Sequence, residues 1–250
     1  MPSPAFVSFL VLVALAAAIL IGGKLRHFLP EKRVNDETKD TIKLAVGLIA
    51  TMTALVLGLL VSSAKGSYDA ERLQVIQMSA KAAVLSRVLA LYGSEANDVR
   101  RAFHASMEEA IAHIWPEGGK ANLNPNTTAG DAVYFKIEAL TPTNAAQEKL
   151  KGIAESTATD LAQERALLVA QSESAISFPM LVVVVSWLIV IFSAFSLLAP
   201  SNHTALTALM ISAIAVAGAI FLLLELDQPF DGMIKIPSRE MKIVADQLPH

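Results

Sequence analysis

One uncharged apolar stretch constrains the fold of this chain more than any other feature. Residues 44–63 have the sequence LAVGLIATMTALVLGLLVSS and carry no charged side chain. A helix of about 20 apolar residues crosses the roughly 30 Å hydrocarbon core of a bilayer. No helix-breaking signal separates this stretch from the polar sequence AKGSYDAER that follows it. We therefore predict a membrane-spanning helix that continues into an aqueous helix.

Three further apolar runs, at residues 5–23, 178–199 and 205–224, indicate three further spans. The first is interpreted as a retained span because no basic residue precedes it, as a signal peptide would require. The chain is 54% hydrophobic and only 17% charged, and its mean hydropathy is +0.50. These values indicate a polytopic membrane protein. The predicted fold class is all-α, with four transmembrane helices and a helical aqueous insert between the second and third.

The predicted domain boundaries follow from these spans. Residues 1–63 hold the first two spans and a short polar link, and residues 64–175 form the aqueous insert. Residues 176–226 form a transmembrane hairpin, and residues 227–250 form a polar C-terminal tail. We expect the insert to be continuous with the helices of the second and third spans. Lysine and arginine are nearly balanced between the two sides, so the positive-inside rule selects no orientation.

Apolar spacing predicts amphipathic helices within the insert. One stripe of the kind that faces a core continues the second-span helix; it comprises Leu73, Ile76, Ala80, Val84, Val88 and Leu91. A second helix is predicted over residues 95–114, ending before Trp115-Pro116. Residues 132–140 fit either a helix or a strand. A third helix begins near Asn144, carries an apolar stripe, and is expected to run on into the membrane.

The second span carries the candidate functional residues. Together with Thr51, the small residues Gly47, Ala54 and Gly58 lie on one face of this helix, because the four positions are spaced by 4, 3 and 4 residues. Small residues on one face let another helix approach closely in lipid, where packing drives association. We predict that these three residues pack against a helix. This helix is also the one expected to line a pore, if the protein forms one.

Two other sets of polar residues are candidate sites. Glu225 and Asp227 end the fourth span, and such acidic residues are candidates for a function at the membrane boundary; the alternative is an ordinary interfacial helix end. His104 and His113 flank two glutamates on one helix. They are nine residues apart and therefore lie on opposite faces. A solvated charged face explains them better than a metal site, and we predict no metal.

Several functional classes find no support in the sequence. The chain has no cysteine, which excludes disulfides, thiolate metal sites and a cysteine nucleophile. It contains no H-E-x-x-H, G-x-S-x-G, phosphate-loop or dinucleotide motif, so we expect neither an enzyme nor a bound cofactor. The net charge is −3, and such a chain lacks the basic footprint of a nucleic-acid-binding protein.

Three segments resemble the bestrophin-like family of bacterial membrane proteins. They are DETKDTIKLAVGLIATMTALVLGLLVSSAKGSYDA, LSRVLALYGSEA and VAGAIFLLLELDQPFDGMIKI, at residues 36–70, 85–96 and 216–236. The resemblance covers roughly the whole architecture of two spans, a helical insert and two further spans. It implies a distant similarity to bestrophins, which are pentameric anion channels with a hydrophobic neck on their second helix.

By this resemblance, the neck would be formed by Thr51, Leu55 and Leu59, one helical turn apart. The chain departs from the bestrophin pattern in two ways. Bestrophin necks carry aromatic side chains where this sequence has Leu55 and Leu59, and the first neck position here is a threonine. The acidic calcium clasp also has no clear equivalent, since Glu225, Asp227 and Asp231 are few and widely spaced.

The predicted function is therefore an oligomeric channel that passes small ions, with anions favoured by the resemblance. The expected partners are the lipid bilayer and further copies of the chain, as a homo-oligomer that is a pentamer if it is bestrophin-like. The expected location is the inner (plasma) membrane of a bacterium. The alternative is a non-conducting membrane scaffold or sensor whose helical insert binds a partner.

Overall fold

The structure is a computed structural model that describes residues 3–28, 36–116, 121–123, 128–171, 176–200 and 202–248. Of these described residues, 85% are helical and none lies in a strand, which confirms the all-α class. The chain divides into two compact units. Unit 1 comprises Met1–Gly66 and Ser174–Gln228, and unit 2 comprises Ser67–Glu173 and Pro229–His250.

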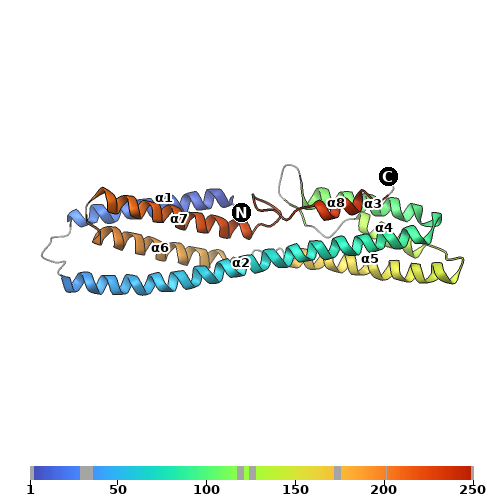
Figure 1. Cartoon of the computed structure of the whole chain (residues 1–250), viewed down its shortest axis with the longest axis horizontal. Coiled ribbons are helices and arrows are strands. Elements are labelled where there is room, and N and C mark those ends of the chain that lie inside the picture. The colour runs from blue at the N-terminus through green and yellow to red at the C-terminus, as the bar shows by residue number, and fades with distance from the viewer. Residues whose placement is uncertain are drawn as a thin grey trace. The chain divides into compact units, whose positions relative to one another are not determined.

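Unit 1 contains α1 (Pro4–Phe28), the first part of α2 (Asp36–Tyr92), α6 (Phe178–Leu198) and α7 (His203–Leu226). Each of these four helices is long and apolar enough to cross a membrane. Helix α1 contacts both α6 and α7, as Figure 1 shows. The buried core of this unit includes Leu15, Ile19, Leu60, Ala64, Val184 and Ile220.

Helices α1 and α6 approach each other most closely at Gly22. A Cβ atom added there would lie 2.5 Å from the carbonyl oxygen of Ser193 and 3.0 Å from the Cβ of Ser196. The hydroxyl of Ser196 donates a hydrogen bond to the carbonyl oxygen of Ile19 across the same contact. Only glycine fits this position without movement of a helix, which is the small-residue packing expected between helices in lipid.

The two helices that were expected to join the insert to the spans differ in the structure. Helix α2 runs unbroken from Asp36 to Tyr92. Helix α5 (Ala145–Gln171), in contrast, ends before α6 begins at Phe178, and Ser177 between them is extended. The reason lies in Pro179, in the first turn of α6. Proline is tolerated in the first turn but breaks a helix interior, so a new helix begins here.

Unit 2 contains the second part of α2, a 3-10 turn η2 (Ser94–Ala96), α3 (Asn97–Ile114), α4 (Thr128–Glu138), α5 and α8 (Arg239–Ala245). The segment that fitted either a helix or a strand is therefore helical, as α4. Gly93 turns the chain between α2 and η2 with a φ of 118°, a value that glycine adopts readily.

The segment that follows α7 is part of unit 2. The indole N–H of Trp115 donates to the carbonyl oxygen of Ile236 at 2.8 Å, and the backbone N–H of Ala121 donates to Oδ1 of Asp231 at 2.9 Å. The sequence marked this tail as polar, yet its apolar side chains are buried in the core of the unit: Phe230, Ile236, Met241, Val244, Ala245 and Leu248.

The stripe expected on the continuation of α2 is mostly on the outside of unit 2. Among its members, Val88 is buried, but the larger part is exposed, namely Leu73, Ile76, Ala80, Val84 and Leu91. The core is made instead by a parallel stripe of Val75, Met78, Ala82, Leu85, Leu89 and Tyr92. Both stripes have helical spacing, so spacing alone could not tell which of them meets the core.

Candidate functional site

The three candidate neck residues lie on an outward face of α2. Leu55 and Leu59 are each 66% exposed, and Thr51 is exposed as well. The hydroxyl of Thr51 donates to the carbonyl oxygen of Gly47 at 2.9 Å, so its hydrogen bond is made within its own helix. This face can therefore be covered by apolar surroundings without leaving the threonine hydroxyl unsatisfied.

The opposite side of the same helix is buried inside unit 1, to which this part of α2 belongs. Leu60 and Ala64 belong to the core of the unit, and Thr53 is buried with its hydroxyl bonded to the carbonyl oxygen of Ile49 at 2.7 Å. Thr53 and Leu55 are two residues apart, which is a rotation of about 200° in an α-helix. The side that carries the candidate neck therefore points away from the chain's own helices.

The small residues predicted to pack against a helix occupy the sector between these two sides. Gly47, Ala54 and Gly58 are all exposed, and a Cβ added at Gly47 or Gly58 would meet no atom within 4 Å. Ala54 is rotated by about 100° from Thr53. Among the described residues no atom lies within 4 Å of a Cβ added at Gly47 or Gly58, so the predicted close packing against a helix stays a prediction.

The outward face of α2 carries apolar side chains in two stretches, which are separated by Gly66 and Asp69. It begins with Leu44 and Leu48, passes through the candidate neck, and continues in unit 2 with Leu73, which is 55% exposed, and Leu91, which is 56% exposed. We call this set the outward stripe; its members are Leu44, Leu48, Thr51, Leu55, Leu59, Leu73, Ile76, Val84 and Leu91. Exposed apolar patches of this kind often mark interaction surfaces.

The two candidate acidic residues differ in their surroundings. Glu225, in the last turn of α7, is only 3% exposed. Asp227 is the C-terminal cap residue of α7, and its Oδ1 accepts a hydrogen bond from the backbone N–H of Ile176 at 3.2 Å. Because Ile176 lies just before α6, Asp227 joins the end of one apolar helix to the start of the other. Its role in the described structure is to position these two helix ends.

The two histidines are not brought together by α3. His104 is buried, with its Nδ1 3.7 Å from Oε2 of Glu108, while His113 is exposed in the last turn. Within the described ranges, no group of three or more histidine, cysteine, aspartate or glutamate side chains is placed to hold a metal ion. The sequence interpretation expected a solvated charged face; Glu108 and His113 are exposed as expected, but His104 is buried.

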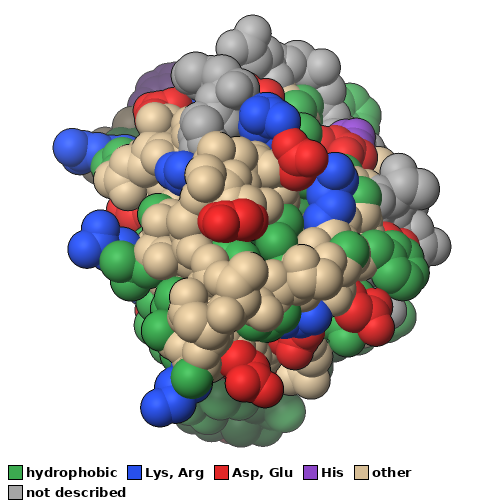
Figure 2. Space-filling view, turned by 90° about the vertical axis from the view of Figure 1, so that its right-hand side faces the viewer, with side chains coloured by type: hydrophobic (Ala, Val, Ile, Leu, Met, Phe, Trp, Pro, Cys, Tyr) green, Lys and Arg blue, Asp and Glu red, His purple; other side chains and the backbone are tan. Residues whose placement is uncertain are grey.

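The face of the molecule drawn in Figure 2 carries basic and acidic side chains interspersed, with apolar patches between them. Alternating signs keep the local potential low, whereas a nucleic-acid surface concentrates basic groups on one face. The more distinctive feature of the surface is therefore the apolar outward stripe.

The sequence interpretation missed the close contact at Gly22. Its signal was present, because Gly22 and Gly23 interrupt the first apolar run and Ser193 and Ser196 interrupt the third. These small and polar residues are the type that brings helices together in lipid. These residues do not by themselves show that the first span pairs with the third.

Comparison with protein families places the whole architecture in one group. The model of the Bestrophin-like domain matches residues 9–241, which runs from within α1 to the start of α8. Comparison with curated proteins and with solved structures found no match.

Proposed function

The chain belongs to the bestrophin-like domain family, and from this premise we propose that it is an oligomeric membrane channel for small ions. In this proposal α1, the first part of α2, α6 and α7 all cross the bilayer, and unit 2 is aqueous. The α-helical spans suit the inner membrane of a bacterium, where we place the protein. Anions are the expected ions because of the resemblance to bestrophins.

The outward stripe of α2 is the observation that carries this proposal. Lipid alone would cover Leu55 and Leu59, because apolar side chains are stable against acyl chains. Lipid would not cover Leu73 and Leu91, which follow Lys65, the first charged residue after the apolar run, and lie in the unit that is aqueous in this proposal. Burying exposed apolar surface is favourable by about 25 cal/mol for each Å² removed from water. Further copies of the chain, arranged in a ring around α2, would shield both parts of the stripe from lipid and from bulk water.

The arrangement of sectors around α2 supports a ring rather than a simple pair. One side of the helix packs against the other helices of unit 1. The small-residue sector of Gly47, Ala54 and Gly58 is open for a close neighbour. Leu55 and Leu59 lie on the far side of this sector from the buried side. When each copy places its small sector against the next copy, Leu55 and Leu59 approach the ring axis. Small residues permit that close approach, and closed rings are common among homo-oligomers.

Leu55 and Leu59 would then act as a hydrophobic constriction. Apolar constrictions gate ions by dewetting, which requires only a narrow ring of apolar side chains. Thr51 would lie one turn away on the same face. No catalytic or cofactor chemistry is part of this proposal, in line with the absence of enzyme motifs from the sequence.

The test is chloride efflux from liposomes that contain the purified full-length protein, with the particle mass measured on the same sample. The Leu55→Ala/Leu59→Ala variant should raise the efflux rate at least tenfold, which corresponds to a barrier lowered by about 1.4 kcal/mol. The matched control is Ile211→Ala/Ile214→Ala, which shortens two exposed side chains on α7 and should leave the rate unchanged.

A particle mass of several times the 26.6 kDa chain supports the ring, and five copies would match the bestrophins. A folded monomer with no efflux from any variant would refute the channel. That result would favour the alternative, a membrane scaffold or sensor whose aqueous unit binds a partner. An equal rise in the α7 control would show a general leak and would equally refute a gate on α2.

A further inference from the structure

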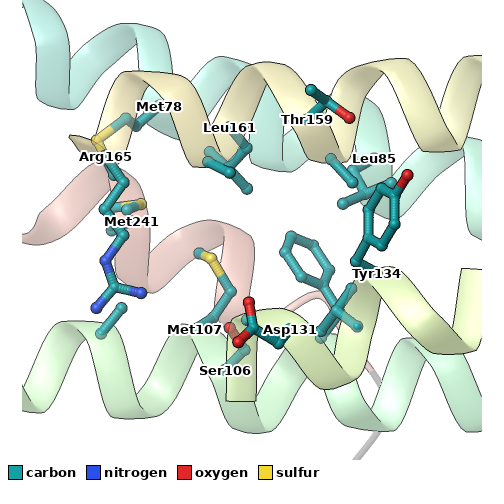
Figure 3. A pocket seen from close by; sticks show the side chains of 16 residues that line it. Met78, Leu85, Ser106, Met107, Asp131, Tyr134, Thr159, Leu161, Arg165 and Met241 are labelled. Carbon is teal, nitrogen blue, oxygen red and sulfur yellow. The ribbon is translucent and has the colours of Figure 1, made fainter. Parts of the chain in front are cut away.

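Unit 2 contains a cavity of about 380 Å³ between α2, α3, α4, α5 and α8. Its wall is mostly apolar and includes Met78, Leu85, Phe103, Met107, Leu161 and Met241. Figure 3 shows Met78 and Leu161 on one side of the space and Met107 on the other. Small-molecule sites have volumes of roughly 300–1,000 Å³, apolar walls and a few polar groups. The cavity meets this description at the small end of the range.

The flexible side chains of the wall suit a flexible guest. Met78, Met107 and Met241 come from three different helices. Methionine is unbranched and adapts its shape to irregular apolar partners, and it is frequent at surfaces that bind varied apolar ligands. A saturated acyl chain is a guest that such a wall accommodates.

Two charged side chains, Arg165 on α5 and Asp131 on α4, line the cavity together with Tyr134 on α4. In Figure 3, Arg165 and Tyr134 lie toward opposite ends of the view and Asp131 lies between them. Arg165 is half-buried, whereas Asp131 is exposed. Burial lowers the pKa of the Arg165 guanidinium, an effect that the Glu109 carboxylate opposes. A guanidinium partly removed from water is stabilised by an anion placed beside it.

Asp131 has less need of a cationic ligand. It lies in the first turn of α4, where the positive end of the helix dipole stabilises a carboxylate. Its exposure to water stabilises it further. The electrostatics of the cavity therefore favour a negative head group at Arg165 over a positive one at Asp131.

We propose that this cavity binds an amphiphilic monocarboxylate, with its acyl chain between α2, α3 and α5 and its carboxylate against Arg165. The size of the cavity selects one medium-length chain rather than a two-chain phospholipid. The guanidinium holds a carboxylate through two parallel N–H donors. This site goes beyond the proposed channel and does not depend on it, because binding is measured without ion flux.

The experiment uses the full-length protein in lipid nanodiscs, with decanoate as the probe and isothermal titration as the readout after subtraction of empty nanodiscs. Decanol and decylamine have the same chain with a neutral and a cationic head group. We expect saturable binding of decanoate that is about tenfold or more tighter than that of either control, the difference expected for charge-assisted hydrogen bonds to the head group.

Two variants locate the site. Arg165→Gln should weaken decanoate binding about tenfold or more and leave decanol binding unchanged, while Ala158→Phe should remove both by filling the cavity. The control Arg101→Gln alters an exposed arginine that pairs with Asp98 outside the cavity and should change neither. Thermal unfolding of each variant shows that it is folded.

Three results would overturn the proposal: no saturable binding above empty nanodiscs, equal binding of decanoate and decylamine, or full decanoate affinity in a folded Arg165→Gln variant. If Arg165→Gln does not fold, the comparison of the three ligands on the unmodified protein decides. If that protein binds decanoate but shows no ion flux, the cavity proposal stands and the channel proposal fails.

Discussion

Replacement of Gly22 by alanine tests the closest helix contact in unit 1. The added Cβ would lie 2.5 Å from the carbonyl oxygen of Ser193, where ordinary contact begins at 3.4 Å. Helices α1 and α6 must therefore separate by up to about 0.9 Å, because a backbone oxygen within a helix cannot move alone. The separation also stretches the hydrogen bond from Ser196 to Ile19.

The size of the effect follows from these two losses. Overpacking of a tight contact costs about 1–3 kcal/mol, and a weakened hydrogen bond adds up to about 1 kcal/mol. The gain in helix propensity from glycine to alanine offsets at most about 1 kcal/mol of this cost. We expect Gly22→Ala to lower the free energy of unfolding of unit 1 by about 1–3 kcal/mol.

Gly23→Ala is the matched control, because it adds the same methyl group to the next residue of the same helix. Its Cβ would lie 3.6 Å from Oγ of Ser196, which is ordinary contact. Unfolding is followed by titration with dodecyl sulfate in a Trp115→Phe background. The chain has two tryptophans, so Trp187 on α6 then reports on unit 1 alone. Equal stability of the two alanine variants would refute the close approach at Gly22.

Two further changes test the buried polar groups. Tyr92 is 3% exposed, and its hydroxyl has no hydrogen-bond partner in the part of the chain that the structure describes. Tyr92→Phe should therefore raise the stability of unit 2 by about 1 kcal/mol. Denaturation followed by Trp115 fluorescence measures this change, and a loss of stability would contradict the prediction. Asp227→Ala should destabilise unit 1 by about 1–3 kcal/mol, because the N–H of Ile176 loses the Asp227 oxygen as its acceptor. Asp227→Asn retains an oxygen at this place and should cost less stability. Equal losses for the two variants in the dodecyl sulfate titration would contradict the role of Asp227 in joining the two helix ends.

The four apolar helices could be predicted from the sequence because long uncharged runs have few alternative structures. The end of α5 was harder to predict. The apolar stripe of α5 and the run of α6 suggested one helix, and Pro179 indicated only where a helix could begin. The residues 172–175 lie outside the described ranges, so the break is defined by the end of α5 at Gln171 and by the extended Ser177.

The face of α2 that meets the core of unit 2 could not be predicted. Leu73 and Val75 are similar in hydropathy, and each belongs to a stripe with helical spacing. Only the positions of α3, α5 and α8 decide that Val75 is buried and Leu73 is exposed. A helix with two apolar faces carries this ambiguity whenever one face is reserved for another chain.

The cavity around Arg165 could not be predicted for a related reason. Its lining comes from five helices that are distant in sequence, and no motif links Met78 to Met241. The local sequence around Arg165 fits an ordinary charged position on an amphipathic helix. A site of this kind is visible only when the tertiary packing is known.

The participation of the last segment in the core of unit 2 has a consequence for biosynthesis. Phe230 packs edge-to-face on Trp115 at a centroid distance of 5.9 Å, and Ile236 and Met241 are buried beside it. The ribosome makes residues 67–173 first, then the two helices α6 and α7, and only then this segment. At roughly 5–20 residues per second, the helices of unit 2 wait several seconds with part of their apolar core open. A chain terminated before Phe230 would keep that surface exposed, so quality-control proteases can distinguish incomplete products from finished ones.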